Sequence, residues 1–307
     1  MKYYKTKKEE PLSKNKSTLS ILAALTCNTF WGFSFLCSRV ALNSAPVIVL
    51  LSHRFLLAWL LMSLLIPLRR NDFHLKGKPI LPLVLLGLLE PVIYFFGEQY
   101  GILHSSTIFS GVMIATIPIV STLAAAPILR EWPTLGQLAC SALSVAGVIG
   151  IGLITRSSGS IDWIGVLALC VAVLSAVGYT LLNRGISTRY TPFERTYCML
   201  MIGAVFFTAM ALFHVRLDWN TYLSPLRELS YLRAVLYLST CCSVICYFLS
   251  SYILTNLSVA KATVFANLTT AVSVFAGAVF LHESFTPIGI LFCVMILVGI
   301  YGVQKAS

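Results

Sequence analysis

The sequence predicts an all-α integral membrane protein with ten transmembrane helices in two inverted five-helix repeats. Of the 307 residues, 58% are hydrophobic and 11% are charged, and the mean hydropathy is +0.86. That composition leaves too little polar surface to cover a water-soluble globule. Ten apolar stretches reach the length of about 17 to 25 residues that a hydrocarbon core of about 30 Å requires. The second half also repeats residues of the first, because Tyr100 and Glu131 recur 152 positions later as Tyr252 and Glu283.

The first five predicted spans cover residues 19 to 43, 46 to 68, 80 to 103, 105 to 129 and 134 to 154. A basic leader, residues 1 to 18, precedes them. The first span is longer than the 7 to 15 residues of a signal-peptide core, and no small-residue cleavage site closes it. It is therefore predicted to be an uncleaved helix.

The second five predicted spans cover residues 163 to 183, 193 to 213, 232 to 254, 258 to 281 and 287 to 304. The two repeats thus occupy 19 to 154 and 163 to 304, and the detectable similarity lies in the last two spans of each. Five is an odd number, so the second repeat must enter the membrane in the opposite sense. Duplicated membrane units of this kind are typical of transporters.

The distribution of basic residues predicts that both termini are cytoplasmic and that the chain lies in the cell membrane. Sixteen Lys and Arg residues fall on the side of the two termini: Lys2, Lys5, Lys7, Lys8, Lys14, Lys16, Arg69, Arg70, Lys76, Lys78, Arg130, Arg184, Arg189, Arg195, Lys261 and Lys305. Four fall on the other side: Arg156, Arg216, Arg227 and Arg233. The net charge of +11 follows mostly from this asymmetry, with some attraction to anionic membrane lipid. It gives no support for nucleic-acid binding, because no soluble module interleaves these residues with aromatic side chains.

The sequence carries no sign of enzymatic chemistry, a metal or a cofactor. All nine cysteines fall inside predicted spans without a C-x-x-C pair, so they are interpreted as small hydrophobic residues. There is no zinc-protease helix, nucleophile elbow or P-loop, and the only aspartates, Asp72, Asp162 and Asp218, lie in predicted loops. We therefore expect no catalytic residues. A membrane receptor or enzyme is the alternative class.

Glu90 is the principal candidate for a functional side chain. An ionisable group in the middle of a span costs several kcal/mol unless it faces a cavity or a partner. Glu90 lies near the middle of the third span, and Pro91 after it removes a backbone donor and opens the helix locally. Helical spacing places Tyr94 and Glu98 on the same side. Glu90 either loads a proton during transport or joins helices as a structural carboxylate.

Two arginines lie within predicted spans. Arg54 is too deep in the second span to reach the interface easily. It either pairs with Glu90 or Glu98, or presents its guanidinium to a substrate carboxylate. Arg39 lies close to the outer end of the first span, where an interfacial anchor is the simpler interpretation.

Four further candidates are neutral. Trp31 lies near mid-depth rather than at the interface, so it either walls a substrate site or packs against lipid. Tyr179, Tyr247 and Asn267 supply the polar groups of the second half, and the Asn267 amide needs a helix partner or a ligand. Charge in one half and neutral polar groups in the other fit an amphoteric or weakly charged metabolite better than a polyanion.

Helix ends and helix-breaking residues complete the prediction. Glu131 and Glu283 precede Pro133 and Pro287, where a carboxylate is expected to favour the start of the next helix. The glycine pairs of the last spans, with Pro91 and Pro118, are expected to supply local bending.

A set of motifs in order along the chain resembles the EamA family of the drug/metabolite transporter superfamily. These are Trp31-Gly32 with Ser34-Phe35, Arg54-Phe55, Tyr100 to Ser106, Pro118, and Glu131 and Glu283 before the glycine-rich last spans. The resemblance covers essentially the whole chain. It implies a central substrate cavity lined by the first four helices of each half, with the fifth peripheral. It also implies the export of amino acids, related metabolites or drugs.

The predicted function is therefore a secondary transporter that exports amino acids or related small metabolites by alternating access. Its partners are a small-molecule substrate, membrane lipid and a coupling proton, and no cofactor is expected. Drugs or sugar derivatives are the alternative substrates.

Overall fold

The computed structural model describes residues 14–69, 73–104, 113–154, 162–280 and 287–306, and every regular element within these ranges is helical. The first half contains α1 (Lys14–Ala41), α2 (Val47–Leu64), α3 (Leu81–Gly87), η2 (Leu88–Ile93), α4 (Tyr94–Leu103), α6 (Ile117–Leu129) and α7 (Leu135–Ile154). The second half contains α8 (Trp163–Gly185), α9 (Pro192–His214), α10 (Trp219–Leu223), η3 (Ser224–Arg227), α11 (Leu229–Tyr237), η4 (Leu238–Ile245), α12 (Cys246–Asn256), α13 (Val259–Thr263), α14 (Ala266–Phe280) and α15 (Pro287–Lys305).

Each predicted span overlaps at least one of these helices, but not all of them have the length of a full crossing. Seven described helices are long and apolar enough to cross a membrane by length and composition. The fourth and fifth predicted spans correspond to the shorter apolar helices Met113–Leu129 and Leu135–Ile151, and the ninth is divided into α13 and α14. The prediction of a multi-pass helical membrane protein is confirmed at this level.

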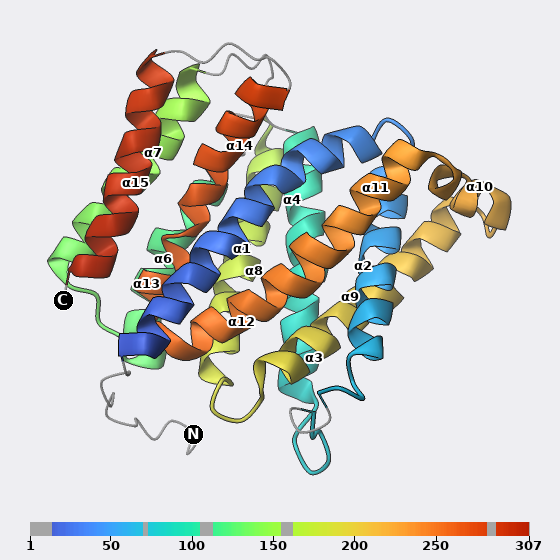
Figure 1. Cartoon of the computed structure of the whole chain (residues 1–307), viewed down its shortest axis with the longest axis horizontal. Coiled ribbons are helices and arrows are strands. Elements are labelled where there is room, and N and C mark those ends of the chain that lie inside the picture. Colours follow the sequence, from blue (N-terminus) through green and yellow to red (C-terminus); the bar gives the residue numbers. More distant parts are fainter. Residues whose placement is uncertain (1–13, 70–72, 105–112, 155–161, 281–286, 307) are drawn as a thin grey trace.

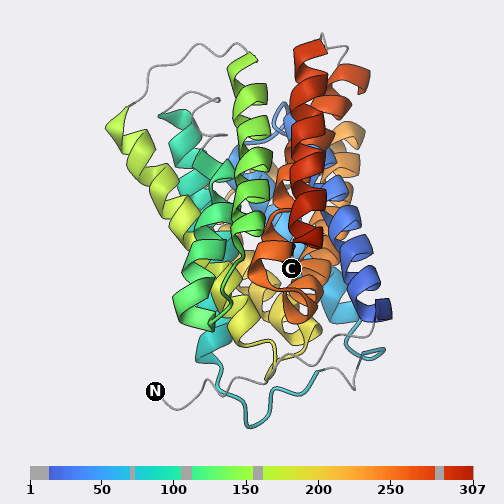
Figure 2. The ribbon, with the colours of Figure 1, turned by 90° about the vertical axis from the view of Figure 1, so that its left-hand side faces the viewer.

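The helices of one half pack mainly against helices of the other (Figure 1). The first helix of the first half, α1, lies on α12 and α14, whereas the first helix of the second half, α8, lies on α4 and α6. In the same way α2 packs on α9, and α7 packs on α15 at one side of the bundle (Figure 2). The two halves are therefore interleaved, and the interior lies between them.

Glycines in α7 and α15 bring these two last helices close together. A Cβ at Gly147 would lie 2.7 Å from the Phe292 carbonyl oxygen, and one at Gly299 would lie 2.6 Å from the Cys140 carbonyl oxygen. These glycines were expected to provide bending, but their role here is close backbone packing, which only a residue without a Cβ permits.

Two long helices are interrupted at matched positions. Between α3 and α4 the helix is kinked within η2 at Glu90, whose backbone is extended, with φ −142° and ψ 122°. Between α11 and α12 the backbone widens through η4. Adding the offset of 152 to Leu88–Ile93 gives 240–245, which falls within Leu238–Ile245. A kink or a widened turn releases backbone carbonyls from the helical hydrogen-bond ladder, and widened turns such as η4 are frequent at functional sites.

The bundle has two ends. We call the end at which α1 begins and α15 ends the terminal face (Figures 1 and 2). The short helix α10 belongs to the opposite end, where Tyr222 is buried and its hydroxyl lies 2.7 Å from Ser52 Oγ of α2. At the start of α10, hydrogen bonds from the Thr221 hydroxyl and the Asn220 amide hold the pKa of Asp218 below its usual value.

Candidate functional site

The site begins at the interruption of the third predicted span. Glu90 is half-buried in the interior, at the residue where the helix is extended. Tyr247 of α12 reaches it from the other half of the chain and donates a hydrogen bond from Oη to Glu90 Oε1 at 3.1 Å. The Tyr247 side chain is buried, with 2% of its surface exposed. The two residues link the interrupted helix of the first half to that of the second.

Trp31 of α1 completes the wall of this site. Its indole Nε1 donates to the Cys242 carbonyl of η4 at 3.0 Å, and its ring meets the Tyr247 ring edge to face at 5.7 Å. Of the two interpretations left open for Trp31, the structure supports an interior position between the halves over packing against lipid.

A matching contact joins the other pair of elements. Ser175 of α8 donates from Oγ to the Leu89 carbonyl of η2 at 2.6 Å. The first helix of each half thus bonds a carbonyl in the interrupted helix of the other half. Sequence reasoning missed Ser175 and the Cys242 carbonyl, because no sequence pattern reveals which backbone carbonyls an interruption releases.

Tyr179 of α8 contributes a buried hydroxyl group to this site. Its side chain is 5% exposed, and its Oη has no partner of normal hydrogen-bond geometry among the described residues, although Ser250 and Asn183 are near. The Glu90 carboxylate lies within electrostatic reach of it. A buried hydroxyl left unpaired costs about 1 to 3 kcal/mol, so a ligand that accepts this bond would gain from it. We refer to Trp31, Glu90, Tyr179 and Tyr247 as the Glu90 group.

Arg54 lies beside the Glu90 group but is held by neutral partners. Its Nε donates to Ser243 Oγ at 2.8 Å, and its guanidinium carbon lies 5.3 Å from the Phe55 ring centroid and 5.4 Å from that of Phe95. Within the described residues it forms no ion pair with Glu90 or Glu98, which was one of the two alternatives for it, and the other, contact with a substrate carboxylate, stays a prediction. Cation–π contacts and one hydrogen bond stabilise the buried charge instead.

The polar face predicted for α4 is divided in two. Tyr94 Oη donates to Glu98 Oε1 at 2.9 Å, which joins these two candidates to each other. Gly97 and Gly101 face α8 directly, since a Cβ at Gly97 would lie 2.8 Å from the Ala168 carbonyl oxygen and one at Gly101 would lie 2.5 Å from the Leu169 side chain. Their role is close contact between α4 and α8.

Two sequence candidates remain, Asn267 and Arg39. Asn267 of α14 donates from Nδ2 to Ser144 Oγ of α7 at 3.0 Å, and Ser144 Oγ lies 3.4 Å from the Ile296 carbonyl of α15. This is the helix-to-helix role that was the simpler interpretation of Asn267. The side chain of Arg39 lies outside the part of the chain that the structure describes.

Two apolar hollows lie outside the Glu90 group. Both are on the described part of the chain, and neither is lined by a member of the Glu90 group. The nearer one, of about 190 Å³, is lined by Leu51, Phe95 and Phe207 among others. The central cavity that the resemblance implies stays a prediction. The described residues do not group three or more His, Cys, Asp or Glu side chains in a way that could hold a metal ion.

The arrangement favours binding over bond chemistry. One carboxylate sits among three aromatic side chains from both halves, and two of these carry hydroxyl groups. Aromatic faces and a carboxylate attract a cation, and the hydroxyls can bond a polar group nearby.

Comparison with known proteins gives a consistent result. A sequence profile described as "EamA-like transporter family" matches residues 18–153 and again 163–304. The chain is 32% identical to "Uncharacterized transporter YcxC" of Bacillus subtilis, over 94% of each protein. It is 28% identical to a Chlamydia trachomatis protein named "S-adenosylmethionine/S-adenosylhomocysteine transporter", over 87% of this chain and 83% of that one. One solved crystal structure superposes with a TM-score of 0.79 and 16% identity, over 94% of this chain and 96% of that chain, which shows the fold alone.

Proposed function

The chain belongs to the EamA-like transporter family, and on that premise we propose that it is a secondary transporter of small metabolites that carry an ammonium group. The observation that carries the proposal is the Glu90 carboxylate, placed at a helix interruption and bonded by Tyr247 of the other half. A charged group at that depth is costly unless it serves transport or pairing. It is bonded by a neutral hydroxyl, which leaves it able to exchange partners.

Alternating access between two inverted five-helix repeats is the mechanism that fits this arrangement. We take the repeats to be residues 19 to 154 and 163 to 304, with ten crossings in all. Support comes from the matched interruptions η2 and η4 and from the reciprocal contacts of α1 and α8. Interrupted helices that meet between repeats are the usual location of a substrate site in secondary transporters.

The substrate class follows from the chemistry of the Glu90 group. A carboxylate beside the rings of Trp31, Tyr179 and Tyr247 suits an ammonium group, and the hydroxyls suit a second polar end. Amino acids and related metabolites have this character. The two compounds in the name of the Chlamydia relative also share it, since both carry an amino-acid end.

Direction and energy coupling complete the proposal. We place the terminal face and the basic leader, residues 1 to 18, on the cytoplasmic side of the cell membrane. Export is the direction that the family resemblance implies. A proton that binds Glu90 when the substrate leaves is the coupling ion. Export of drugs or sugar derivatives by the same route is the competing substrate assignment.

A counterflow measurement tests the proposal. Purified protein in proteoliposomes is preloaded with one unlabelled amino acid at a time, including methionine and aromatic amino acids, and uptake of the labelled compound is followed. The matched comparison is the N-acetyl form of each compound, which keeps the side chain and removes the ammonium charge. We expect counterflow of at least one free amino acid and none of its N-acetyl form.

Two variants decide how the result is interpreted. Glu90→Gln should lower this counterflow severalfold without abolishing it, whereas Glu228→Gln, at an exposed carboxylate of the opposite end, should leave it unchanged. Equal counterflow of free and N-acetylated compounds contradicts the ammonium assignment. A lack of counterflow for every compound, with ligand binding intact, contradicts transport itself and favours a receptor.

A further inference from the structure

A charged network that the transport site does not use lies at the terminal face. Glu131, just after α6, forms an ion pair with Arg184 of α8, with 2.6 Å between Oε1 and Nε. Its other oxygen, Oε2, accepts the backbone N–H of Val259, the first residue of α13, at 2.7 Å. Glu131 was expected to favour the start of α7, which follows it in sequence. Instead it holds the start of a helix in the other half.

Arg184 holds the end of α12 in the same place. Besides Glu131, it donates from Nη1 to the carbonyls of Leu254 at 3.0 Å and Thr255 at 2.8 Å. These carbonyls lie in the last turn of α12, where no intrahelical donor reaches them and a cation is favoured. Glu131 and Arg184 therefore hold both sides of the break between α12 and α13, at residues 257 and 258.

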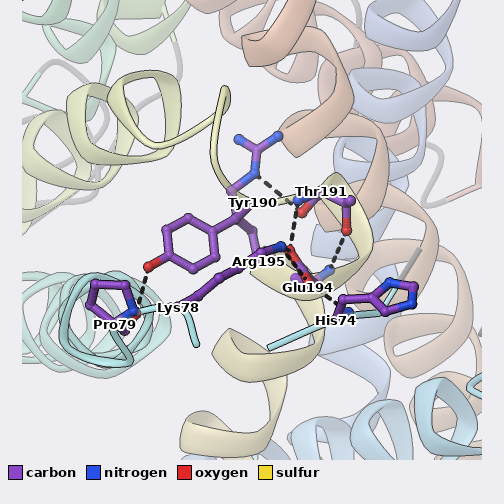
Figure 3. Close-up of polar contacts among 7 residues, drawn as sticks. All are labelled: His74, Lys78, Pro79, Tyr190, Thr191, Glu194 and Arg195. Atoms are coloured by element: carbon purple, nitrogen blue, oxygen red, sulfur yellow. Dashed lines mark hydrogen bonds and ion pairs between the residues drawn. The ribbon is translucent and has the colours of Figure 1, made fainter. Parts of the chain in front are cut away.

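Arg195, at the start of α9, supports the same break from inside. Its side chain is fully buried and donates to the Asn183 carbonyl and side-chain oxygen, to the Ser251 carbonyl and to Thr255 Oγ1. The adjacent Glu194 faces the other way, toward the loop before α3 (Figure 3), and its carboxylate accepts bonds from Lys78 Nζ and the His74 amide, each at 2.8 Å. Arg184 and Arg195 were counted among the surface charges that set orientation, but both have specific partners in the interior.

We infer that Glu131 and Arg184 form a gate that closes the terminal face over the transport site. The inference rests on the proposed alternating-access function, because a path to this face must separate α12 and α13 from α6 and α8. Glu131 and Arg184 join these four elements, and both remain partly exposed, at 16% and 18%. Water can therefore replace their bonds as the elements part. The fully buried Arg195 also joins α8 to α12, through Asn183 on one side and Ser251 and Thr255 on the other, so opening must part these bonds as well. Arg195 therefore marks the inner limit of the gate.

Each residue of the gate has backbone partners that suit only its own charge, so the two residues are not interchangeable. Glu131 faces a backbone N–H, and Arg184 faces two backbone carbonyls. Exchanging the two charges would keep the ion pair but place an arginine against a donor and a glutamate against acceptors. A simple ion pair survives the exchange, whereas this gate does not.

Hydrogen exchange measured by mass spectrometry on protein in lipid nanodiscs tests the gate without a substrate. In Glu131→Gln and Arg184→Gln we expect exchange in a peptide covering 252–263 to rise about tenfold, equivalent to about 1.4 kcal/mol. The opposite-end peptide 229–237 should be unchanged. The double variant Glu131→Arg with Arg184→Glu, in which the two charges are swapped, should show the same rise in hydrogen exchange as the single variants. Arg189→Gln, an exposed arginine at the same face, is the matched control and should behave like the unaltered protein.

A second measurement distinguishes a gate, which controls access to the site, from contacts that only stabilise the break between α12 and α13. Ser250, half-buried near Tyr179, lies between the site and the terminal face. Alkylation of Ser250→Cys by a hydrophilic maleimide should be faster when Glu131→Gln is added. Three outcomes would each overturn the gate. The first is faster hydrogen exchange at 252–263 without faster alkylation, and the second is faster hydrogen exchange in all helices. The third is normal hydrogen exchange in the double variant Glu131→Arg with Arg184→Glu. Because these measurements need no substrate, failure of the gate is distinguishable from failure of counterflow.

Discussion

Tyr247 and Glu90, 157 positions apart in the chain, meet through a hydrogen bond of 3.1 Å between the two interrupted helices. The bond crosses the boundary between the halves, so any rocking of one half against the other lengthens or remakes it. Trp31 holds the Tyr247 ring from the side and is itself tied to the backbone of η4. A conformational change of the bundle would therefore change the hydrogen bond between Tyr247 and the Glu90 carboxylate.

Replacing Tyr247 with Phe keeps the ring against Trp31 and removes only the hydroxyl. We expect substrate affinity to fall about tenfold, because a hydrogen bond to a charged group contributes about 1.5 to 3 kcal/mol. Binding is measured by intrinsic tryptophan fluorescence. Tyr301→Phe, at an outward-facing tyrosine that is 65% exposed, is the control and should leave affinity unchanged. Unaltered affinity in Tyr247→Phe would remove this hydroxyl from the site.

Glu90→Gln should make the transport rate independent of pH while the protein still folds. The groups that act on Glu90 are Tyr247, Glu98 and Arg54, and Tyr94 and Tyr179 are in turn affected by its charge. Glu98 is the other carboxyl, so Glu98→Gln is the necessary comparison. Rates are compared across a series of pH values with equal pH on both sides of the liposome membrane. Persistence of the pH dependence in Glu90→Gln would show that Glu90 is not the proton carrier.

Arg54→Ala should impair transport more than Arg39→Ala. Arg54 is 7% exposed and joins η4 through Ser243 while packing on Phe55 and Phe95, so its loss disturbs the wall of the site. Arg39 lies near a span end, where an anchor can be lost with little effect. Initial rates at matched protein levels give the comparison. Equal and small effects would reduce both arginines to structural anchors.

Gly97→Ala should destabilise the bundle by about 1 to 3 kcal/mol, the usual cost of overpacking. The new Cβ would lie 2.8 Å from a backbone oxygen of α8, which cannot move aside as a side chain can. Gly178→Ala offers a matched control in α8, because its Cβ would meet only Leu89 side-chain atoms at 3.4 Å. Thermal unfolding in detergent should show a lower midpoint for the first variant alone.

Arg195→Met should be the most destabilising of these changes, by about 3 kcal/mol. It leaves oxygens of Asn183, Ser251 and Thr255 buried without a donor, and each such group costs about 1 to 3 kcal/mol. Arg189→Met, at an exposed arginine of the same face, should change stability by less than about 0.5 kcal/mol. Unfolding in SDS gives both values. A similar small loss in both would contradict the buried network.

Some predictions from sequence failed because they assigned partners from local spacing. Arg195 was placed among surface charges, since its predicted position was the start of a span, yet the fold encloses it completely. Glu131 was related to the helix that follows it, but its bonds go to Arg184 and Val259, which are distant in sequence. The glycines were interpreted as flexible, and they serve contact between helices.

The amino-acid sequence alone determined that the chain is a duplicated helical membrane protein and that Glu90, Trp31 and Tyr247 are candidates for one site. Composition, span length and repetition are local or periodic properties, so they can be read without a fold. Only the tertiary structure decided which candidates meet, that Asn267 belongs to a separate helix contact, and that Glu131 and Arg184 hold the break between α12 and α13. Those relationships join side chains to backbone groups more than fifty residues away, and such partners are fixed by how the halves pack rather than by any sequence pattern.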